Sequence, residues 1–234
     1  MWTFPPKRIV VGVDFAPASS AALAVAGLLA RQFSATVTAV HAETFEPPPY
    51  FTAEQMQALG QQDQALRRQA EQHLERLASR DAGVAVRARV EPGSAADVVL
   101  AIARDADLIA VGTHGRRGPS RWWLGSVAER VVRGSGVPVL VLHGPAGPAP
   151  FMRIGLLVGP HGAVGASAKY AEGLASRFGG RVMTVPAEGV SSTVAGLDAG
   201  VVVVPAPHDA APAWLGQVSD QVLRGCTVPV LFVP

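Results

Sequence analysis

Residues 108–127 read LIAVGTHGRRGPSRWWLGSV, and this stretch decides the fold more than any other part of the chain. The apolar run 108–111 predicts a buried strand. The segment GTHG at 112–115 predicts a loop, and the pair GS at 125–126 precedes a helical pattern that starts at Val127. Glycines allow the backbone to approach a ligand closely, and the free amides of a helix N-terminus favour anions. Strand, glycine-rich loop and helix in this order therefore predict a site that holds a ligand by its phosphate groups.

The composition is that of a globular protein with ample core material. Apolar residues make up 49% and charged residues 16% of the 234 residues, and the formal net charge is +2. No long basic run exists, so we expect no nucleic acid as a partner. The longest apolar helical run, Ala21 to Ala30, is too short for a bilayer, so we expect no membrane partner either. Cys226 is the single cysteine and the segment before the first strand has no signal core, which favours a cytoplasmic protein.

Two segments of the chain resemble each other. Residues 124–142 read LGSVAERVVRGSGVPVLVL and residues 215–233 read LGQVSDQVLRGCTVPVLFV, with 10 of 19 positions identical and no gap. The segment RIVVGVD at 8–14 likewise resembles RIGLLVG at 153–159, and an alanine-rich helical stretch follows each. Self-similarity of this kind predicts a duplicated unit.

The boundary between the two units is marked by composition. Residues 143–150 read HGPAGPAP, and this density of glycine and proline is typical of a linker. We therefore expect a first domain over residues 1–143 and a second over residues 151–234.

Strands and helices alternate in the first unit. Capping-box patterns at Thr52-x-x-Gln55 and Ser94-x-x-Asp97 predict the starts of two helices. The alternation predicts a parallel sheet with right-handed crossovers, in which a ligand binds beyond the carboxyl ends of the strands. The third strand has a polar side, which suits a sheet edge. The expected strands are Ile9 to Asp14, Thr36 to His41, Val84 to Val90, Leu108 to Val111 and Val137 to Leu142.

The second unit is shorter than the first. About fifteen residues separate its strand Arg181 to Val185 from its strand Val201 to Val204, against about sixty-six at the equivalent place in the first unit. The second unit therefore lacks one strand and two helices by this comparison.

These motifs together resemble the universal stress protein family. The resemblance rests on the spacing G-x2-G-x9-G-S from Gly112, on VDF at 13–15, on VHA at 40–42 and on LGSV at 124–127. It covers residues 6–142 well and residues 151–234 in part, as in a tandem form with a degenerate, shortened second domain.

The resemblance implies an α/β fold with two doubly wound parallel sheets. The implied strand order is 3-2-1-4-5 in the first domain and a shortened 2-1-4-5 in the second. Family domains pair edge to edge through their fifth strands, so we expect an intramolecular pseudo-dimer, because both fifth strands, Val137 to Leu142 and Val228 to Val233, are apolar edges. Whether two chains associate further into a homodimer stays open.

The resemblance also implies an adenine nucleotide across the ends of strands one, two and four. The implied cofactor is ATP, or ADP or AMP, with Mg²⁺ supporting the phosphates. Asp14 and Gly112 would meet the ribose, and the backbone of Ala42 would meet the adenine. Gly115, Gly125, Ser126 and Val127 would hold the phosphates. The expected site also includes Phe15, His114 and Arg116. The family often has a serine where this chain has Ala16.

Several of these residues have a second interpretation. Ser126 either binds phosphate or caps the following helix, since Ser126-x-x-Glu129 fits a capping box. Asp14 either contacts a ligand or caps a loop. Arg116 and its neighbour Arg117 either neutralise phosphates or face solvent, and the pair at 122–123 (WW) either closes over the site or packs between domains.

The leading hypothesis is a regulatory or stress-response protein that binds nucleotide in its first domain only. In the second unit VPAPH at 204–208 replaces the glycines, Gln217 replaces the serine, and proline has no amide to offer. One alternative is a slow ATPase or phosphotransfer enzyme in which His114 is the base. Another is an interaction module without nucleotide. The chain has neither a GxxxxGK[ST] loop nor histidines at metal-ligand spacing.

Overall fold

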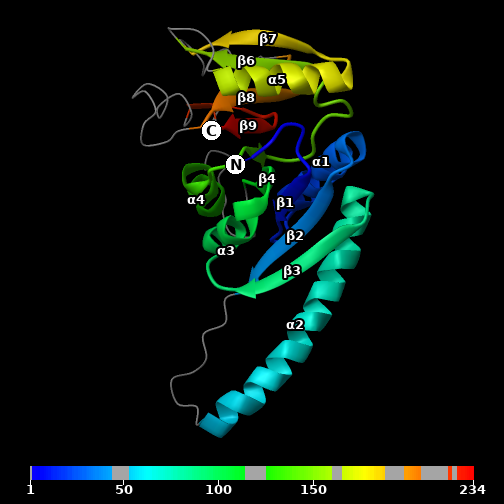
Figure 1. The fold of residues 1–234 in the computed structure, drawn as a ribbon, viewed down its shortest axis with the longest axis vertical. Coiled ribbons are helices and arrows are strands. Elements are labelled where there is room, and N and C mark those ends of the chain that lie inside the picture. Colours follow the sequence, from blue (N-terminus) through cyan, green and yellow to red (C-terminus); the bar gives the residue numbers. More distant parts are fainter. Residues whose placement is uncertain are drawn as a thin grey trace.

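Nine strands form one sheet in the computed structural model (Figure 1). The structure describes residues 2–43, 53–113, 125–159, 165–187, 198–206, 221–222 and 226–234. For residues 53–65 it describes the backbone only. Within this part of the chain the sheet order is β3-β2-β1-β4-β5-β9-β8-β6-β7.

The strands and helices lie close to their expected places. The first half contains β1 (Arg8–Gly12), α1 (Pro17–Phe33), β2 (Thr36–Glu43), α2 (Ala53–Ala82), β3 (Val86–Pro92), α3 (Ala95–Ile102), a 3-10 turn (Ala103–Asp105), β4 (Leu108–Gly112), α4 (Ser126–Gly134) and β5 (Val139–Leu142). The second half contains β6 (Arg153–Val158), α5 (Gly165–Phe178), β7 (Arg181–Pro186), β8 (Val201–Pro205) and β9 (Val230–Val233). None of the described helices is long and apolar enough to cross a bilayer.

Each half is parallel and follows the order that the resemblance implies. In the first half β1 pairs with β2 and β4, β3 lies outside β2, and β5 lies outside β4. β3 is an edge strand as expected, and its polar side carries an Arg89–Glu91 ion pair of 2.7 Å. In the second half β6 pairs with β7 and β8, and β9 lies outside β8.

The two sheets expected from the sequence are joined into one, because β5 and β9, the fifth strands of the two halves, pair edge to edge. The two strands are antiparallel, with Leu140 opposite Leu231. Every residue of both strands is buried. A buried sheet edge must have partners for its N–H and C=O groups, and each of these strands supplies them to the other.

The strand ends of the two halves carry equivalent hydrogen bonds. The amide of Thr113 donates to the Leu142 carbonyl over 2.9 Å, and the amide of Ala206 donates to the Val233 carbonyl over 2.7 Å. In the same register Gly112 lies beside Leu142, whereas Pro205 lies beside Val233. The end of β8 therefore corresponds to the end of β4, with proline at the glycine position.

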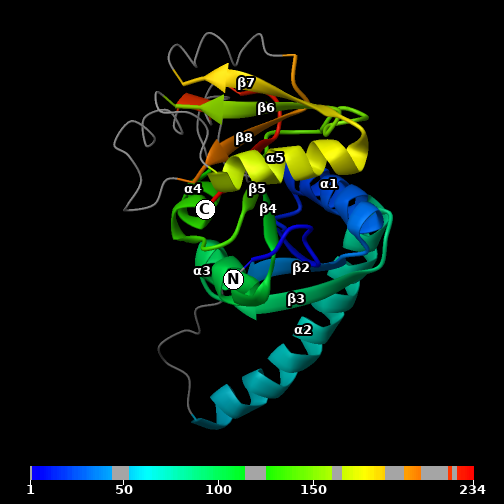
Figure 2. The same ribbon diagram turned by 45° about the horizontal axis from the view of Figure 1, so that its top comes forward.

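Helices cover both faces of the sheet (Figures 1 and 2). Apolar residues of α1, α2 and α5 form one core layer, and those of α3 and α4 belong to the other. The α1 and α5 helices meet at their C-terminal ends, where the rings of Phe33 and Phe178 are 5.9 Å apart and Gln32 Nε2 donates to the Arg177 carbonyl. The two halves therefore share one core layer across the β5–β9 junction.

Two predicted capping boxes are not formed. Ser94 is the N-cap of α3 but makes no side-chain cap bond, because Arg130 donates to its hydroxyl and to Asp97. Ser126 is the first residue of α4, and Gly125 occupies the N-cap position. The capping interpretation of Ser126 is therefore wrong. Thr52 lies outside the described residues.

The segment before β1 is fixed by a buried carboxylate. Asp107 is 2% exposed and accepts hydrogen bonds from Thr3 N, Thr3 Oγ1, Lys7 N and Arg8 N, at 3.0 to 3.2 Å. Burial alone would raise the pKa of Asp107, but these hydrogen bonds and the Arg8 guanidinium outweigh it and lower the pKa. Asp107 therefore holds the N-terminal segment against the start of β4 as a charged group.

Candidate functional site

The predicted site lies at one edge of the sheet, where β1, β2 and β4 end. These three strands are parallel neighbours, so their carboxyl ends lie side by side. Asp14 follows the end of β1, and Ala42 and Gly112 lie at the ends of β2 and β4. The Val13 amide donates to the Val40 carbonyl over 2.8 Å, which extends the contact between β1 and β2 up to the site. This is the edge at which parallel α/β sheets bind ligands.

Asp14 shapes the turn between β1 and α1. Its Oδ1 accepts a hydrogen bond of 3.0 Å from the amide of Ala16, the N-cap of α1. The loop-capping role weighed for Asp14 is therefore present. The other carboxylate oxygen, Oδ2, has no hydrogen-bond partner among the described residues, so the carboxylate can cap the turn and still accept a bond from a ligand.

Phe15 and His41 form an aromatic wall beside this turn. Phe15 has a φ of 62°, is 42% exposed, and its ring centroid is 4.8 Å from that of His41. His41 Nδ1 is 2.7 Å from the Val13 carbonyl oxygen and donates a hydrogen bond to it, which holds the ring beside the turn. The sequence assigned no role to His41, although its place at the end of β2, next to Ala42, could have indicated one.

Gly112 and Gly125 are both required by close backbone packing. A Cβ on Gly112 would lie 2.7 Å from the Ala18 Cβ, so the glycine brings the start of α1 onto the end of β4. A Cβ on Gly125 would collide with the Thr113 carbonyl oxygen. The two ends of the loop 114–124 are therefore in contact, and the N-terminus of α4 lies directly beside the end of β4.

The first turn of α4 presents amides at this place. Its N-cap, Gly125, has φ −60° and ψ 137° and supplies no side-chain cap. The first amides of a helix have no partner within the helix. Ser126 is exposed, Val127 is 38% exposed, and Glu129 pairs with Arg133 over 3.2 Å instead of turning back to the cap. This arrangement suits an anionic group.

The remaining predicted site residues lie outside the described part of the chain. These are His114, Gly115 and Arg116, together with the Trp pair at 122–123 and Gln217 in the second half. The structure thus brings Asp14 and Phe15 to the end of β2, and Gly112 to Gly125. It does not describe the middle of the loop.

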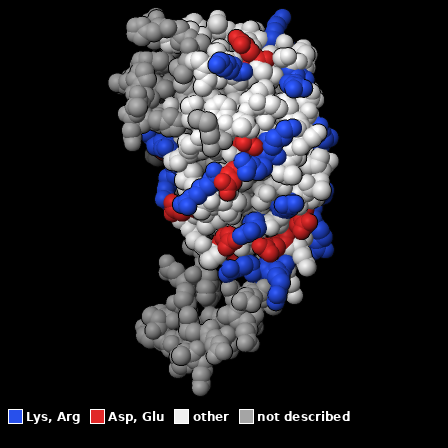
Figure 3. All heavy atoms as spheres, viewed as in Figure 1, with Lys and Arg blue, Asp and Glu red and all other residues white. Residues whose placement is uncertain are grey.

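Charges around the described part of the molecule are mixed. Figure 3 shows basic and acidic side chains interspersed on one face. Arg130 pairs with Asp97 over 2.7 Å, and Arg133 pairs with Glu129. No group of three or more acidic, histidine or cysteine side chains suited to a metal ion occurs among the described residues.

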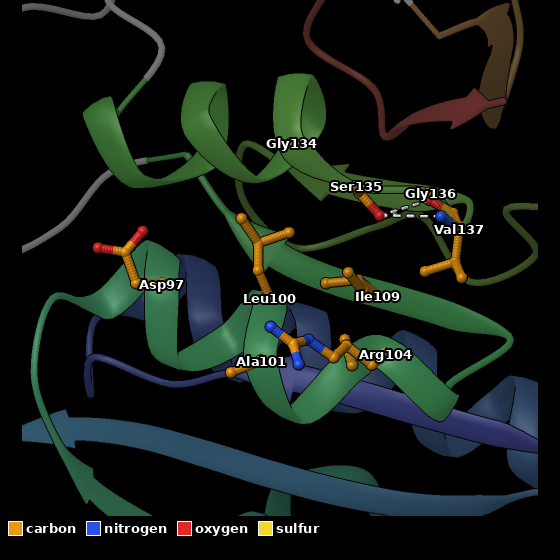
Figure 4. Close-up of a pocket in the computed structure, with 10 residues that line it drawn as sticks. Asp97, Leu100, Ala101, Arg104, Ile109, Gly134, Ser135, Gly136 and Val137 are labelled. Carbon is orange, nitrogen blue, oxygen red and sulfur yellow. Dashed lines mark hydrogen bonds between the residues drawn. The ribbon is translucent and has the colours of Figure 1, made fainter.

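A separate hollow of about 560 Å³ lies between α3, the end of α4 and the start of β5 (Figure 4). Leu100, Ile109 and Val137 form its apolar part, and the Ser135 hydroxyl donates to the Val137 carbonyl. It lies near the amino ends of β4 and β5, at the edge of the sheet opposite the predicted site, and no predicted site residue lines it.

Known proteins resemble this chain over somewhat more than half of its length in sequence and over nearly its whole length in fold. A universal stress protein of Methanocaldococcus jannaschii is 32% identical over 143 residues, which cover 59% of this chain and 83% of that protein. One of Mycolicibacterium smegmatis is 33% identical over 141 residues, which cover 58% of this chain and 45% of that protein. The crystal structure of a universal stress protein from Archaeoglobus fulgidus has a TM-score of 0.67 at 14% identity, with 97% of this chain and 95% of that chain covered, which shows the shared fold.

The family model for the universal stress protein family matches residues 5–143, the half that contains the predicted site. This match spans more than half of the chain, and the archaeal relative is matched over most of its own length. The chain belongs to the universal stress protein family.

Proposed function

We propose that this protein is a regulatory universal stress protein that binds one ATP, in its first half only. The observation that carries the proposal is the contact between Gly125 and the Thr113 carbonyl, which places the first-turn amides of α4 beside the end of β4. A nucleotide across the ends of β1, β2 and β4 would extend its phosphates toward these amides.

Each described residue has a distinct part in this proposal. The free Oδ2 of Asp14 would accept a hydrogen bond from a ribose hydroxyl. The backbone of Ala42 would meet the adenine edge, beside the rings of Phe15 and His41. The amides of Ser126 and Val127 would donate to phosphate oxygens. Mg²⁺, when bound, would neutralise phosphate charge.

The described residues support holding a nucleotide better than cleaving one. Fast hydrolysis needs a base beside the attacking water. His41 lies at the end of β2, where the adenine would bind, rather than at α4, where the phosphates would bind. We therefore propose that ATP binding changes the state of the protein, and that the protein hydrolyses ATP slowly at most.

The second half would have a structural role and would not bind nucleotide. Pro205 occupies the position of Gly112, and proline has neither an amide nor glycine's freedom to pack closely. We infer that the chain is a tandem duplication in which β5 and β9 pair as the fifth strands of two subunits do. One chain would then mimic a homodimer with a single working site.

Calorimetric titration with ATP and Mg²⁺ tests this function. We expect close to one site per chain, and we expect Asp14→Asn to weaken binding about tenfold. Asparagine keeps the Oδ1 acceptor of the Ala16 amide, so the variant should keep the wild-type melting temperature. Arg87→Gln, on the exposed edge strand β3, is the matched control and should bind normally. Two equal sites, or none, would refute the proposal.

A further inference from the structure

Two hollows occupy equivalent places on the first helix of each half. One, of about 740 Å³, lies along α1 and is bordered by the linker residues 145–148 and Pro150. The other, of about 570 Å³, lies along α5 and is bordered by Trp2 and Phe4 of the N-terminal segment. In both cases the segment that precedes the first strand of one half lies over the first helix of the other half.

The equivalence is residue by residue. Ile9 lies beside Leu108 and Ile154 lies beside Val201, so β1 and β6 have the same register with their neighbours. The two halves align from there without a gap to Phe33 and Phe178, the last residues of α1 and α5. In this alignment the α1 hollow is lined by Ser20, Ala21, Ala24 and Val25, and the α5 hollow by Gly165, Ala166, Lys169 and Tyr170 at the same positions.

The hollows differ in the rings that the covering segment supplies. On α5 the Phe4 ring centroid is 4.8 Å from that of Tyr170, and the Trp2 ring centroid is 5.7 Å from it. Phe4 also fills the space above Gly173, where a Cβ would collide with its ring. The same alignment places Gly147 where the N-terminal segment has Trp2, and Ala149 where it has Phe4. The linker therefore crosses α1 without either ring.

The walls of the α1 hollow suit an aromatic ring. Ala21 is 7% and Val25 4% exposed, so they form an apolar floor. The exposed ring of Phe15 borders the hollow. Arg31 and Asp81 also line it, one basic and one acidic group whose charges balance. Arg31 Nη1 already donates a hydrogen bond of 3.0 Å to the Ala82 carbonyl, and Asp81 already forms an ion pair with Arg80.

We propose that the α1 hollow is a binding site for a flat, uncharged aromatic molecule. Its ring would lie where Trp2 and Phe4 lie on α5, between the floor of α1 and the linker. A volume of about 740 Å³ is within the usual range of small-molecule sites, which are mostly apolar with a few polar groups. This site shares only Phe15 with the proposed nucleotide site among the residues that line it, and it does not use the loop at 112–126.

Indole, the side-chain fragment of tryptophan, is the probe. We expect saturation-transfer NMR to detect indole binding to the full chain with a Kd on the order of 1 mM. Gly147→Trp should supply the ring from the chain itself, because no atom lies within 4 Å of a Cβ built there. This variant should bind indole at least tenfold more weakly and melt at a higher temperature. Gly144→Trp, in the same linker with equally open space but outside the hollow, is the matched control and should bind as the wild type does.

Absence of binding to the wild type at about ten times that concentration would overturn the proposal. Equal binding by wild type and Gly147→Trp would also overturn it, because indole would then lie elsewhere. Ala24→Leu fills the hollow from the helix side at an exposed position of α1, and it tests the site independently should the linker variant fold poorly. Loss of indole binding in Ala24→Leu, with the wild-type circular dichroism spectrum retained, is the expected result.

Discussion

Leu140 of β5 and Leu231 of β9 lie directly opposite each other where the two halves of the sheet meet. Both are almost fully buried and belong to the same core layer. They also occupy matching positions in the two similar segments, LGSVAERVVRGSGVPVLVL and LGQVSDQVLRGCTVPVLFV. The pair thus joins equivalent positions of the two halves at the β5–β9 junction. Because the halves share this core layer, we expect them to unfold together.

Coupling between the two leucines tests that shared core. We expect Leu140→Ala and Leu231→Ala each to cost about 2–5 kcal/mol of unfolding free energy. Opposed residues in contact do not act independently, so the double variant should depart from the sum by at least about 0.5 kcal/mol. Denaturant unfolding of the four proteins measures this. Val86→Ala, on the far edge strand β3, should add to Leu140→Ala without coupling, and equal additivity of both pairs would contradict the shared core.

Asp107 should stabilise the protein in a pH-dependent way. Asp107→Asn places an NH₂ group against one of the two pairs of donors that the carboxylate now satisfies, so we expect a loss of about 3 kcal/mol at pH 7. Because the folded-state pKa of Asp107 is lowered, its contribution is present above the ordinary carboxyl pKa and is lost as the pH falls below about 4. Urea unfolding at pH 7 and at pH 3 should show the gap between wild type and variant shrinking. A gap that does not depend on pH would contradict a charged Asp107.

Cys226 should be an unreactive thiol. Burial raises its pKa to about 11, against a partial lowering by a hydrogen bond from the Val228 backbone. At pH 8 the folded protein should react with Ellman's reagent roughly a hundredfold more slowly than the urea-unfolded chain. Since the folded-state pKa is the higher one, this thiol should leave stability unchanged below about pH 9 and reduce it as the pH rises toward 11. Rapid labelling of the folded protein would contradict its burial.

Gly125 should be needed for the shape of the loop base. Gly125→Ala places a Cβ against the Thr113 carbonyl oxygen, so the start of α4 must move away from β4. We expect a loss of about 1–3 kcal/mol of stability and a large loss of ATP affinity. Gly136→Ala has open space for its Cβ and should change neither quantity. Thermal melting and calorimetry compare the two variants, and equal behaviour would show that the contact is not important.

Periodicity and the internal repeat predicted most of the fold. The apolar runs placed every described strand within two or three residues of its observed bounds, because buried parallel strands leave a strong local pattern. The pairing of β5 with β9 was also expected, because both are apolar edge strands, and it joins the two expected sheets into one. The role of Trp2 and Phe4 on α5 was missed, although two aromatic residues in the first four are a usable signal.

The candidate site was predicted in outline more than in detail. Asp14, Ala42 and Gly112 reach the same sheet edge because parallel strands end together. The capping boxes at Ser94 and Ser126 failed for reasons beyond local sequence. The Arg130 guanidinium of α4 donates to the Ser94 hydroxyl and to Asp97. The close contact of Gly125 with Thr113 makes α4 begin one residue earlier than expected. Long-range contacts decided both cases.

The most direct test of the central claim compares ATP affinity in Ser126→Pro and Ser126→Ala. Ser126 is the first residue of α4, where proline is well tolerated, and the ψ of 137° at Gly125 suits a following proline. Ser126→Pro therefore removes the amide while keeping the helix, and Ser126→Ala removes only the hydroxyl. If α4 holds the phosphates, Ser126→Pro should weaken ATP binding about tenfold or more relative to Ser126→Ala, at an unchanged melting temperature. Equal ATP affinity in the two variants would contradict the account.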